Sequence, residues 1–249
     1  MKDFATVWRR SATGELSWLA PDGPVSVPAV PLLDGEEPCV ALPLAHLDLV
    51  DTLAPRAAFS LTAPSPGSDT GLVGVGPVRV RLDPEGRVFG RELVRQEADK
   101  HPPTRLRAGS LMARKENWWW MARALVTLPE VERVYEVRRR DRAEDALLVR
   151  ELGSDVRVDV VTARDWSAGP GESVELWSRD GGELAEQDEP GGRGGRRALV
   201  MGHQASPDFE RWERWTRSGT LSGQTLAVAE ADGGPDPDPR PYRLLERLR

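Results

Sequence analysis

The dominant pattern of apolar and polar residues along the chain is that of β-strands rather than helices: some segments alternate, and others are short apolar runs. In 72–82, Val78, Val80 and Leu82 lie on one side of a predicted strand, and the arginines between them lie on the other. Residues 24–33 also alternate, but their prolines suit a strand at a sheet edge or a bulge. Further strands are predicted at 37–44, 56–62, 156–163, 173–178, 197–202, 215–221 and 224–229.

Helical signals are few and short. Residues 89–101 have helical spacing, and the two prolines that follow are expected to end that helix. The Ser-Pro-Asp run at 206–208 combines an N-cap hydroxyl, a first-turn proline and an acid near the positive helix end. It predicts a helix of about two turns. Leucines at helical spacing in 242–249 predict a short docked helix, or else a frayed tail.

Three adjacent tryptophans stand in 117–128, which we interpret as one long strand with a helix as the alternative. Trp118 and Trp120 would share one face of this strand, and Trp119 would lie on the other. Such rings can form the wall of a site for a flat ligand. They can also fill a core or a subunit interface, which we favour.

Composition narrows the classes of protein that remain. The chain has 249 residues and a net charge of −6. Its single cysteine, Cys39, excludes an internal disulfide and a cysteine-rich metal site, and its apolar neighbours predict a buried thiol. No run approaches the ~18 apolar residues of a membrane span, and the N-terminus has no apolar leader segment. We therefore expect a cytoplasmic protein with no membrane partner and no bound metal.

Positive charge gathers in the middle of the chain. Residues 101–150 carry 11 Lys and Arg against 7 Asp and Glu, largely through Arg138, Arg139, Arg140 and Arg142. A solvated strand end or turn explains this cluster better than a phosphate-binding strip does. A nucleic-acid-binding domain is more often basic as a whole, so nucleic acid is not an expected partner.

The other candidate motifs are weak. Gly71, Gly74 and Gly76 invite comparison with a dinucleotide-binding loop. The last glycine of the G-x-G-x-x-G pattern is missing, however, and the stretch runs into a strand rather than a helix. The carboxylate pairs lie in predicted turns and have no spacing that indicates acid–base catalysis. His203 follows a strand and could lie beside haem or flavin, but a histidine that caps the sheet is the favoured interpretation. No residue is identified as catalytic.

Residues 38–84 read as a strand, a short amphipathic helix, a strand, a loop and a longer strand. This order resembles the FMN-binding split-barrel superfamily, the pyridoxamine 5'-phosphate oxidase-like proteins, over about residues 15–137. The resemblance implies an α+β, mostly β fold: a split β-barrel with short flanking helices, and either a tandem or duplicated half-barrel or an extension after it. The expected division is 1–145 for the split barrel, 146–232 for a second β-rich half, and 233–249 for a Pro/Gly linker and tail.

The chain departs from the family at the phosphate-binding motif. Matching the strand that begins near Arg56 places Thr52 at the family's asparagine and Asp48 and Leu49 at its basic pair. The cation that would contact the flavin phosphate is thus missing. A charge-assisted hydrogen bond is worth ~1.5–3 kcal/mol, so its loss weakens binding by about 10- to 100-fold.

By resemblance, members use FMN or the deazaflavin F420 for two-electron chemistry, at sites shared between two barrels. The expected function is therefore a flavin- or deazaflavin-linked oxidoreductase acting on an unknown small molecule, with haem as a less favoured cofactor. A homodimer or an internal pseudo-dimer is expected. The alternative is a degenerate barrel without cofactor that acts as a binding or structural module. The residues expected near the cofactor are His46, Thr52, Arg56, Trp120 and Arg123.

Overall fold

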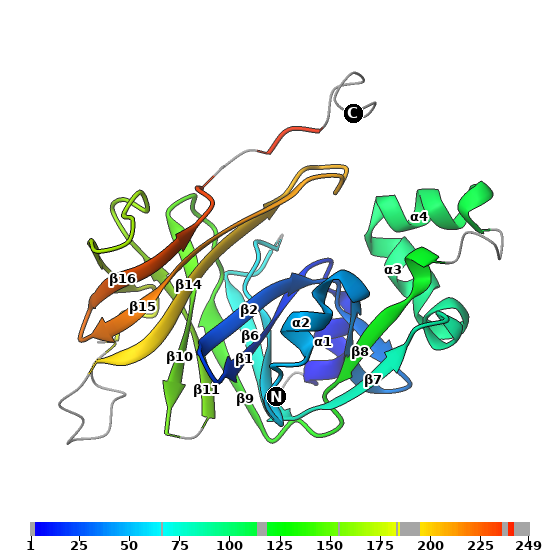
Figure 1. Cartoon of the computed structure of the whole chain (residues 1–249), viewed down its shortest axis with the longest axis horizontal. Coiled ribbons are helices and arrows are strands. Elements are labelled where there is room, and N and C mark those ends of the chain that lie inside the picture. The colour runs from blue at the N-terminus through cyan, green and yellow to red at the C-terminus, as the bar shows by residue number, and fades with distance from the viewer. Residues whose placement is uncertain are drawn as a thin grey trace.

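Three antiparallel sheets and several short helices form the computed structural model of the chain (Figure 1). The structure describes residues 3–65, 67–113, 119–153, 155–182, 184, 195–235 and 239–241. The mostly β, α+β prediction is confirmed: strands dominate, and the helices are short.

The first two sheets enclose one hydrophobic core. Buried Trp8 from α1 (Phe4–Arg10) packs against Phe59 in this core and donates its indole N–H to the carbonyl of Leu32 at 3.0 Å. The first sheet has the order β2 (Gly23–Ala29), β1 (Gly14–Ala20), β5 (Arg56–Leu61), β6 (Thr70–Pro77) and β9 (Arg133–Arg138). The second has the order β3 (Leu32–Asp34), β4 (Glu37–Pro43), β8 (Arg123–Thr127) and β7 (Arg79–Asp83).

The third sheet consists of seven strands that all follow β9 in the sequence. Its order is β12 (Ser173–Glu175), β16 (Thr225–Asp232), β15 (Trp212–Ser222), β14 (Arg196–Ala205), β10 (Asp145–Leu152), β11 (Asp155–Thr162) and β13 (Trp177–Ser178). One face packs against the first sheet, where Val73 and Val75 join Leu147, Val158 and Met201 in a shared core. The domain boundary between residues 145 and 146 stays a prediction.

The helices lie beside the first two sheets. A short helical segment is formed by η1 (Leu44–His46) and α2 (Leu47–Val50), and a longer one by η2 (Phe89–Leu93), α3 (Val94–Lys100), α4 (Pro102–Ala108) and η3 (Leu111–Ala113). The carboxylate of Asp83 accepts the N–H groups of Arg87, Val88 and Phe89 at 2.8–2.9 Å, which fixes the start of the longer segment.

Several local predictions agree with the structure. The predicted strands at 37–44 and 56–62 are β4 and β5, and the proline-containing strand is β2, at a sheet edge. The predicted helix over 89–101 is η2 with α3, although Pro102 begins α4 rather than ending helical structure. Cys39 is buried, as expected, and burial raises the pKa of its thiol.

The single strand predicted over 72–82 is wrong. The chain leaves the first sheet after β6 and enters the second as β7, with Val78 between them. Because β7 is an edge strand, Val80 and Leu82 are 41% and 54% exposed despite their alternation.

The long strand predicted over 117–128 is also wrong in its first half. Strand β8 begins only at Arg123, and residues 119–121 form a helical turn. Trp119 is exposed, whereas Trp120 is buried edge-on against Phe89 and donates its indole N–H to the carbonyl of Met112 at 3.0 Å. Trp118 lies outside the described residues.

The two-turn helix predicted after Ser206 is a hairpin turn between β14 and β15. The Ser206 hydroxyl oxygen accepts the N–H of Arg211 at 3.0 Å, and the Ser206 carbonyl accepts that of Phe209 at 2.8 Å. Phe209 has a φ of 57°, which a helix cannot contain. Ser206 therefore accepts backbone N–H groups within a turn that reverses the chain, instead of capping a helix. The helix predicted over 242–249 lies outside the described residues.

Candidate functional site

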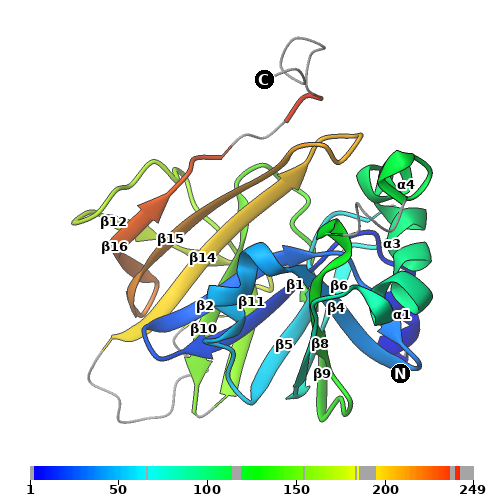
Figure 2. The same ribbon diagram turned by 45° about the vertical axis from the view of Figure 1, so that its right-hand side comes forward.

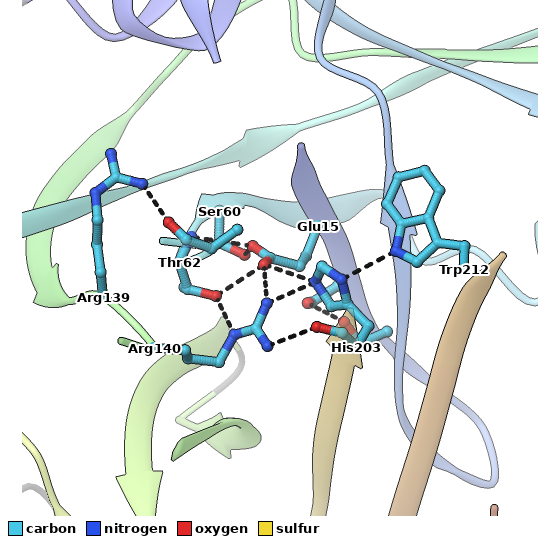
Figure 3. Close-up of polar contacts among 10 residues, drawn as sticks. Glu15, Ser60, Thr62, Arg139, Arg140, His203 and Trp212 are labelled. Carbon is cyan, nitrogen blue, oxygen red and sulfur yellow. Dashed lines mark hydrogen bonds and ion pairs between the residues drawn. The ribbon is translucent and has the colours of Figure 1, made fainter. Parts of the chain in front are cut away.

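A buried carboxylate on β1 forms the centre of a polar cluster between the first and third sheets (Figure 3). Glu15 has no exposed surface. One of its carboxylate oxygens accepts the hydroxyl of Ser60 at 2.8 Å and the N–H of Thr62 at 3.3 Å. The other accepts the Thr62 hydroxyl at 2.8 Å and the guanidinium of Arg140 at 3.0 Å. The carboxylate is therefore fully solvated by protein donors.

Arg140 completes this cluster from the loop between β9 and β10. Besides the ion pair with Glu15, its Nε donates to the Thr62 hydroxyl at 2.9 Å and its Nη1 donates to the carbonyl of His203 at 3.2 Å. Arg139 is buried too, with donors on the carbonyls of Thr70 and Ala63. The prediction of a wholly solvated arginine turn is thus wrong for two of its four members, because acceptors from strand ends surround them.

His203 on β14 has both ring nitrogens engaged. The indole N–H of Trp212 can only donate, and it lies 3.1 Å from Nδ1 of His203, so Nδ1 is an acceptor. Nε2 lies 3.0 Å from the carboxylate of Glu15 and 2.7 Å from Nη2 of Arg140. His203 therefore connects Trp212 to the buried ion pair of Glu15 and Arg140.

The pKa values follow from these contacts. Burial by itself would raise the pKa of Glu15, but the hydrogen bond from His203 and the charge of Arg140 outweigh it and lower the pKa to about 2. Burial, followed by the charge of Arg140, lowers the pKa of His203 to about 4. At neutral pH the cluster holds one carboxylate, one guanidinium and a neutral imidazole.

A pocket of about 340 Å³ opens beside this cluster. His203 and Arg140 contribute to its wall, and the β14–β15 turn forms an opposite part of it. Its aromatic lining comes from Phe209, Trp212 and Trp215, and its further charged lining from Arg142, Asp145 and Glu213. The pocket thus combines flat apolar surfaces with a fixed polar wall, which is the usual composition of a small-molecule site.

The charged residues of the pocket differ in whether they already have an ion-pair partner. Asp145 is paired with Arg179 at 3.2 Å and Glu213 with Arg211, and Arg140 is bound to Glu15. The guanidinium of Arg142 has no ion-pair partner among the residues that the structure describes. Arg142 is therefore the pocket cation that can accept an anionic group without breaking an existing ion pair.

The β14–β15 hairpin also reaches the longer helical segment, near α3 and α4 (Figures 1 and 2). The ring of His101, between α3 and α4, lies 5.7 Å from that of Phe209 and 6.3 Å from that of Trp212. His101 Nδ1 is 3.0 Å from the hydroxyl of Thr104, which donates to Glu97 at 2.6 Å. Trp212 therefore lies between two histidines, each connected to a buried glutamate.

Apart from Trp120 and Arg123, the five residues expected near a cofactor share no hydrogen bond, ion pair or ring contact with one another among the residues that the structure describes. Arg56 is paired with Glu132 at 2.6 Å and Asp155 at 3.3 Å, and the Glu132 hydrogen bond is the first cause of its raised pKa. The Thr52 hydroxyl donates to Leu49 at 2.7 Å. His46 is half-buried in η1, and desolvation followed by the charge of Arg214 lowers its pKa.

Trp120 and Arg123 do lie together, on either side of Phe89. The Arg123 guanidinium is 4.2 Å from the Phe89 ring centre and 3.6 Å from the carboxylate of Glu97. Both residues are nine-tenths or more buried. Their contacts make them parts of the packing between β8 and the longer helical segment.

The FMN site implied by the resemblance does not fit these residues. A flavin phosphate needs an available cation, yet Arg56 already has two carboxylate partners and Asp48 stands at the expected basic position in α2. No cluster of three or more metal-ligating side chains occurs among the residues that the structure describes. Within the same residues, no helix is long and apolar enough to cross a membrane.

The sequence indicates Arg140 and His203 separately, but neither Glu15 nor the association of the three residues. Glu15 lies in the apolar strand GELSWLA, and an acid inside such a strand is the one signal that could have indicated a buried charge. Its partners Arg140 and His203 are 125 and 188 residues away in the chain, so no local pattern connects them.

Comparisons with known proteins reach only distant structures. No protein-family model and no curated protein sequence matches the chain. A conserved hypothetical protein of Mycobacterium tuberculosis is 17% identical with a TM-score of 0.37, over 55% of this chain and 84% of its own. A heme-binding protein of Mycobacterium smegmatis is 16% identical with a TM-score of 0.34, over 90% of this chain and 92% of its own.

A pyridoxamine 5'-phosphate oxidase-related, FMN-binding protein of Nostoc punctiforme is 12% identical, with a TM-score of 0.33 over 88% of this chain and 93% of its own. The superfamily that the sequence resembles is thus represented among the solved structures that this chain is similar to. At this distance no ligand or residue role is transferred from them, and the site is argued from the chain's own residues.

Proposed function

We propose that this chain binds a small molecule with a flat ring system and an anionic group, in the pocket beside His203. The observation that carries the proposal is the composition of the pocket wall. Three aromatic side chains and Arg142, whose guanidinium is not used in an ion pair among the described residues, line one cavity. The cavity lies next to the buried cluster of Glu15, Arg140 and His203, whose polar groups are hydrogen-bonded to one another.

The cluster gives the pocket a rigid wall. Trp212 is held by its hydrogen bond to His203, which is held in turn by Glu15. A ring placed against Trp212 would therefore meet a surface that is already ordered, so little conformational entropy is lost on binding. Stacking on an aromatic face adds ~0.5–1.5 kcal/mol beyond area burial.

A narrower form of the proposal is a flavin- or deazaflavin-linked oxidoreductase acting on a small molecule. FMN and F420 are both flat, ring-bearing anions, and this pocket has the matching chemistry that the five sequence-predicted residues lack. When bound, the cofactor would supply the redox chemistry. The chain would contribute the aromatic wall and the cation Arg142. Haem is less favoured, because both nitrogens of His203 already have partners.

The rival function is a cofactor-free binding module of the same fold. It uses the same pocket for a ligand that is not a redox cofactor, and the two functions differ in the absorbance of the loaded protein. The predicted homodimer or pseudo-dimer stays a prediction, which sedimentation velocity of the purified chain can check.

The test is a titration of the purified protein with FMN, F420 and haem, followed by absorbance and by tryptophan fluorescence. Dansylglycine, a fluorescent ring with a carboxylate, serves as a ring-anion probe that is not a cofactor. We expect at least one of these four to bind, and Trp212→Ala to weaken it by about 10-fold or more. The matched control is Trp119→Ala, which changes a tryptophan that is 75% exposed and lies outside the pocket.

The outcomes separate the alternatives. Tight binding of FMN or F420 supports the oxidoreductase, whereas binding of dansylglycine alone supports the cofactor-free module. A protein that binds none of the four, or whose affinity falls equally in both tryptophan variants, contradicts the proposed pocket.

A further inference from the structure

A second, more open hollow adjoins the pocket described above. It has a volume of about 470 Å³ and is lined by Arg142, Glu144, Thr162, Ala163, Arg164 and Trp177. Arg142 lines both the pocket and this hollow, so the two adjoin at that residue. A ligand seated against Trp212 that reached past Arg142 would enter the hollow.

Arg164 gives the hollow its own cation. Its guanidinium lies 5.6 Å from the ring centre of Trp177, a contact that orients the side chain without neutralising it. Among the described residues, the ion pairs found include none for Arg164, just as they include none for Arg142. By contrast, Arg179 nearby is bound to Asp141 and Asp145.

The hollow therefore has two available cations against one acid, Glu144. The backbone carbonyl of Glu144 is used by the indole N–H of Trp166 at 2.9 Å, which ties this part of the chain to the second core of the third sheet. Two cations against one acid leave the hollow with an excess of positive charge, which attracts an anionic group.

We propose that the pocket and the hollow form one extended site for a ligand whose ring lies against Trp212 and whose flexible acidic tail runs over Arg142 to Arg164. This inference rests on the proposed function and adds the shape of the ligand to it. The substrate class is an elongated ring-bearing acid, such as a ring with a phosphate or a carboxylate on a chain of several atoms.

A probe series with one ring and tails of different length tests this shape. Dansylamide has no anion, dansylglycine has a carboxylate close to the ring, and dansyl-triglycine has the same single charge two residues further out. Each added residue extends the tail by up to ~3.3–3.6 Å. Fluorescence titration of the wild-type protein should rank dansyl-triglycine above dansylglycine, and both above dansylamide.

Two arginine variants test the two parts of the site separately. Arg164→Ala should remove most of the advantage of the long tail, weakening dansyl-triglycine by about 3- to 5-fold while leaving dansylglycine unchanged. Arg142→Ala should weaken both acids by a similar factor and leave dansylamide unchanged. Arg87→Ala is the matched control, since Arg87 is exposed and pairs only locally with Glu85.

Each result decides the proposal. If dansylglycine binds but dansyl-triglycine binds no better, or if Arg164→Ala weakens both acids equally, the extended site is wrong while the proposed pocket stands. If none of the three probes binds and FMN also fails, the proposed function and the extended site fall together. Melting temperatures of the variants, expected within about 2 °C of wild type for surface changes, confirm that they fold.

Discussion

Two buried glutamate–arginine pairs stand on opposite sides of Trp212, and they behave in opposite ways. Glu15 and Arg140 are 3.0 Å apart, and the pKa of Glu15 is lowered to about 2. Glu97 and Arg123 are 3.6 Å apart, and burial raises the pKa of Glu97 in spite of the arginine. The same two residue types, both buried, therefore produce carboxylates of opposite character.

The number of donors explains the difference. Glu15 accepts from two hydroxyls, one backbone N–H, one guanidinium and one imidazole. Glu97 accepts one hydroxyl hydrogen bond, from Thr104, besides its longer contact with Arg123. Arg123 itself has an Nε without a partner among the described residues. A buried charge is stabilised by a complete set of hydrogen bonds more than by a single counter-ion.

The largest effect is expected from Glu15→Gln. The neutral amide leaves Arg140 buried without its counter-ion and places an N–H₂ group among donors, so unfolding free energy should fall by about 3–5 kcal/mol. Urea unfolding at pH 7 measures this loss. A decrease below about 1 kcal/mol would show that Glu15 is not ionised in the folded protein.

Acid should destabilise the cluster next most strongly. The pKa of His203 is about 4 in the folded protein against its usual 6.5, so the unfolded chain binds more protons between these values. Stability is complete above about pH 6.5 and falls by about 2 kcal/mol by pH 5 through this residue. His101, also at about 4, acts in the same direction.

Glu15 extends the acid loss to lower pH, since its stabilisation is present above 4.5 and disappears as the pH falls toward 2. Glu97 has the opposite sign, because a raised pKa favours the folded state in acid and its contribution is lost as pH rises. Urea unfolding between pH 7 and pH 4.5 checks this, with His203→Gln as the comparison. An equally steep loss in that variant would contradict the role given to His203.

A smaller effect is expected from Glu97→Gln. Because ionised Glu97 is poorly solvated, its replacement should cost about 1–2 kcal/mol, less than the same change at Glu15. The two variants can be measured side by side in urea. The comparison between the pairs fails if Glu97→Gln is the more damaging of the two.

The smallest effect is expected from Trp212→Phe, which keeps an aromatic ring but removes the indole N–H. Loss of one neutral hydrogen bond should cost about 0.5–1.5 kcal/mol. Without that donor on Nδ1, the neutral imidazole is less favoured and the pKa of His203 should rise. NMR titration of the imidazole measures this pKa, and an unchanged value would contradict the role of Nδ1 as the acceptor of the Trp212 N–H.

Much of the fold could be predicted because strand patterns are local. The apolar runs of β4 and β5 are visible within eight residues, and the prolines of β2 correctly indicate an edge. The errors arise where tertiary context decides. The change of sheet at Val78 depends on β8, which lies far away in the sequence. At Phe209 the pairing of β14 with β15 replaces the helix that the Ser-Pro-Asp run predicts.

The site could not be predicted for the same reason. Glu15, Arg140 and His203 are brought together only when the third sheet packs against the first. A cluster of arginines in the sequence resembles a solvated turn, and nothing local shows that Arg140 has buried acceptors. Of the residues expected near a cofactor, His46 and Thr52 come from matching a motif whose basic pair this chain lacks. Trp120 and Arg123 come from the tryptophan run, and they pack beside Phe89.

Hydrogen–deuterium exchange with and without saturating dansylglycine tests the central claim most directly, because it reports where on the chain a ligand binds. Binding in the pocket beside His203 predicts slower exchange in 140–145 and in 202–213, with 46–56 and 120–123 unchanged. Protection confined to 46–56 and 120–123 would place the ligand at the sequence-predicted residues and contradict the pocket.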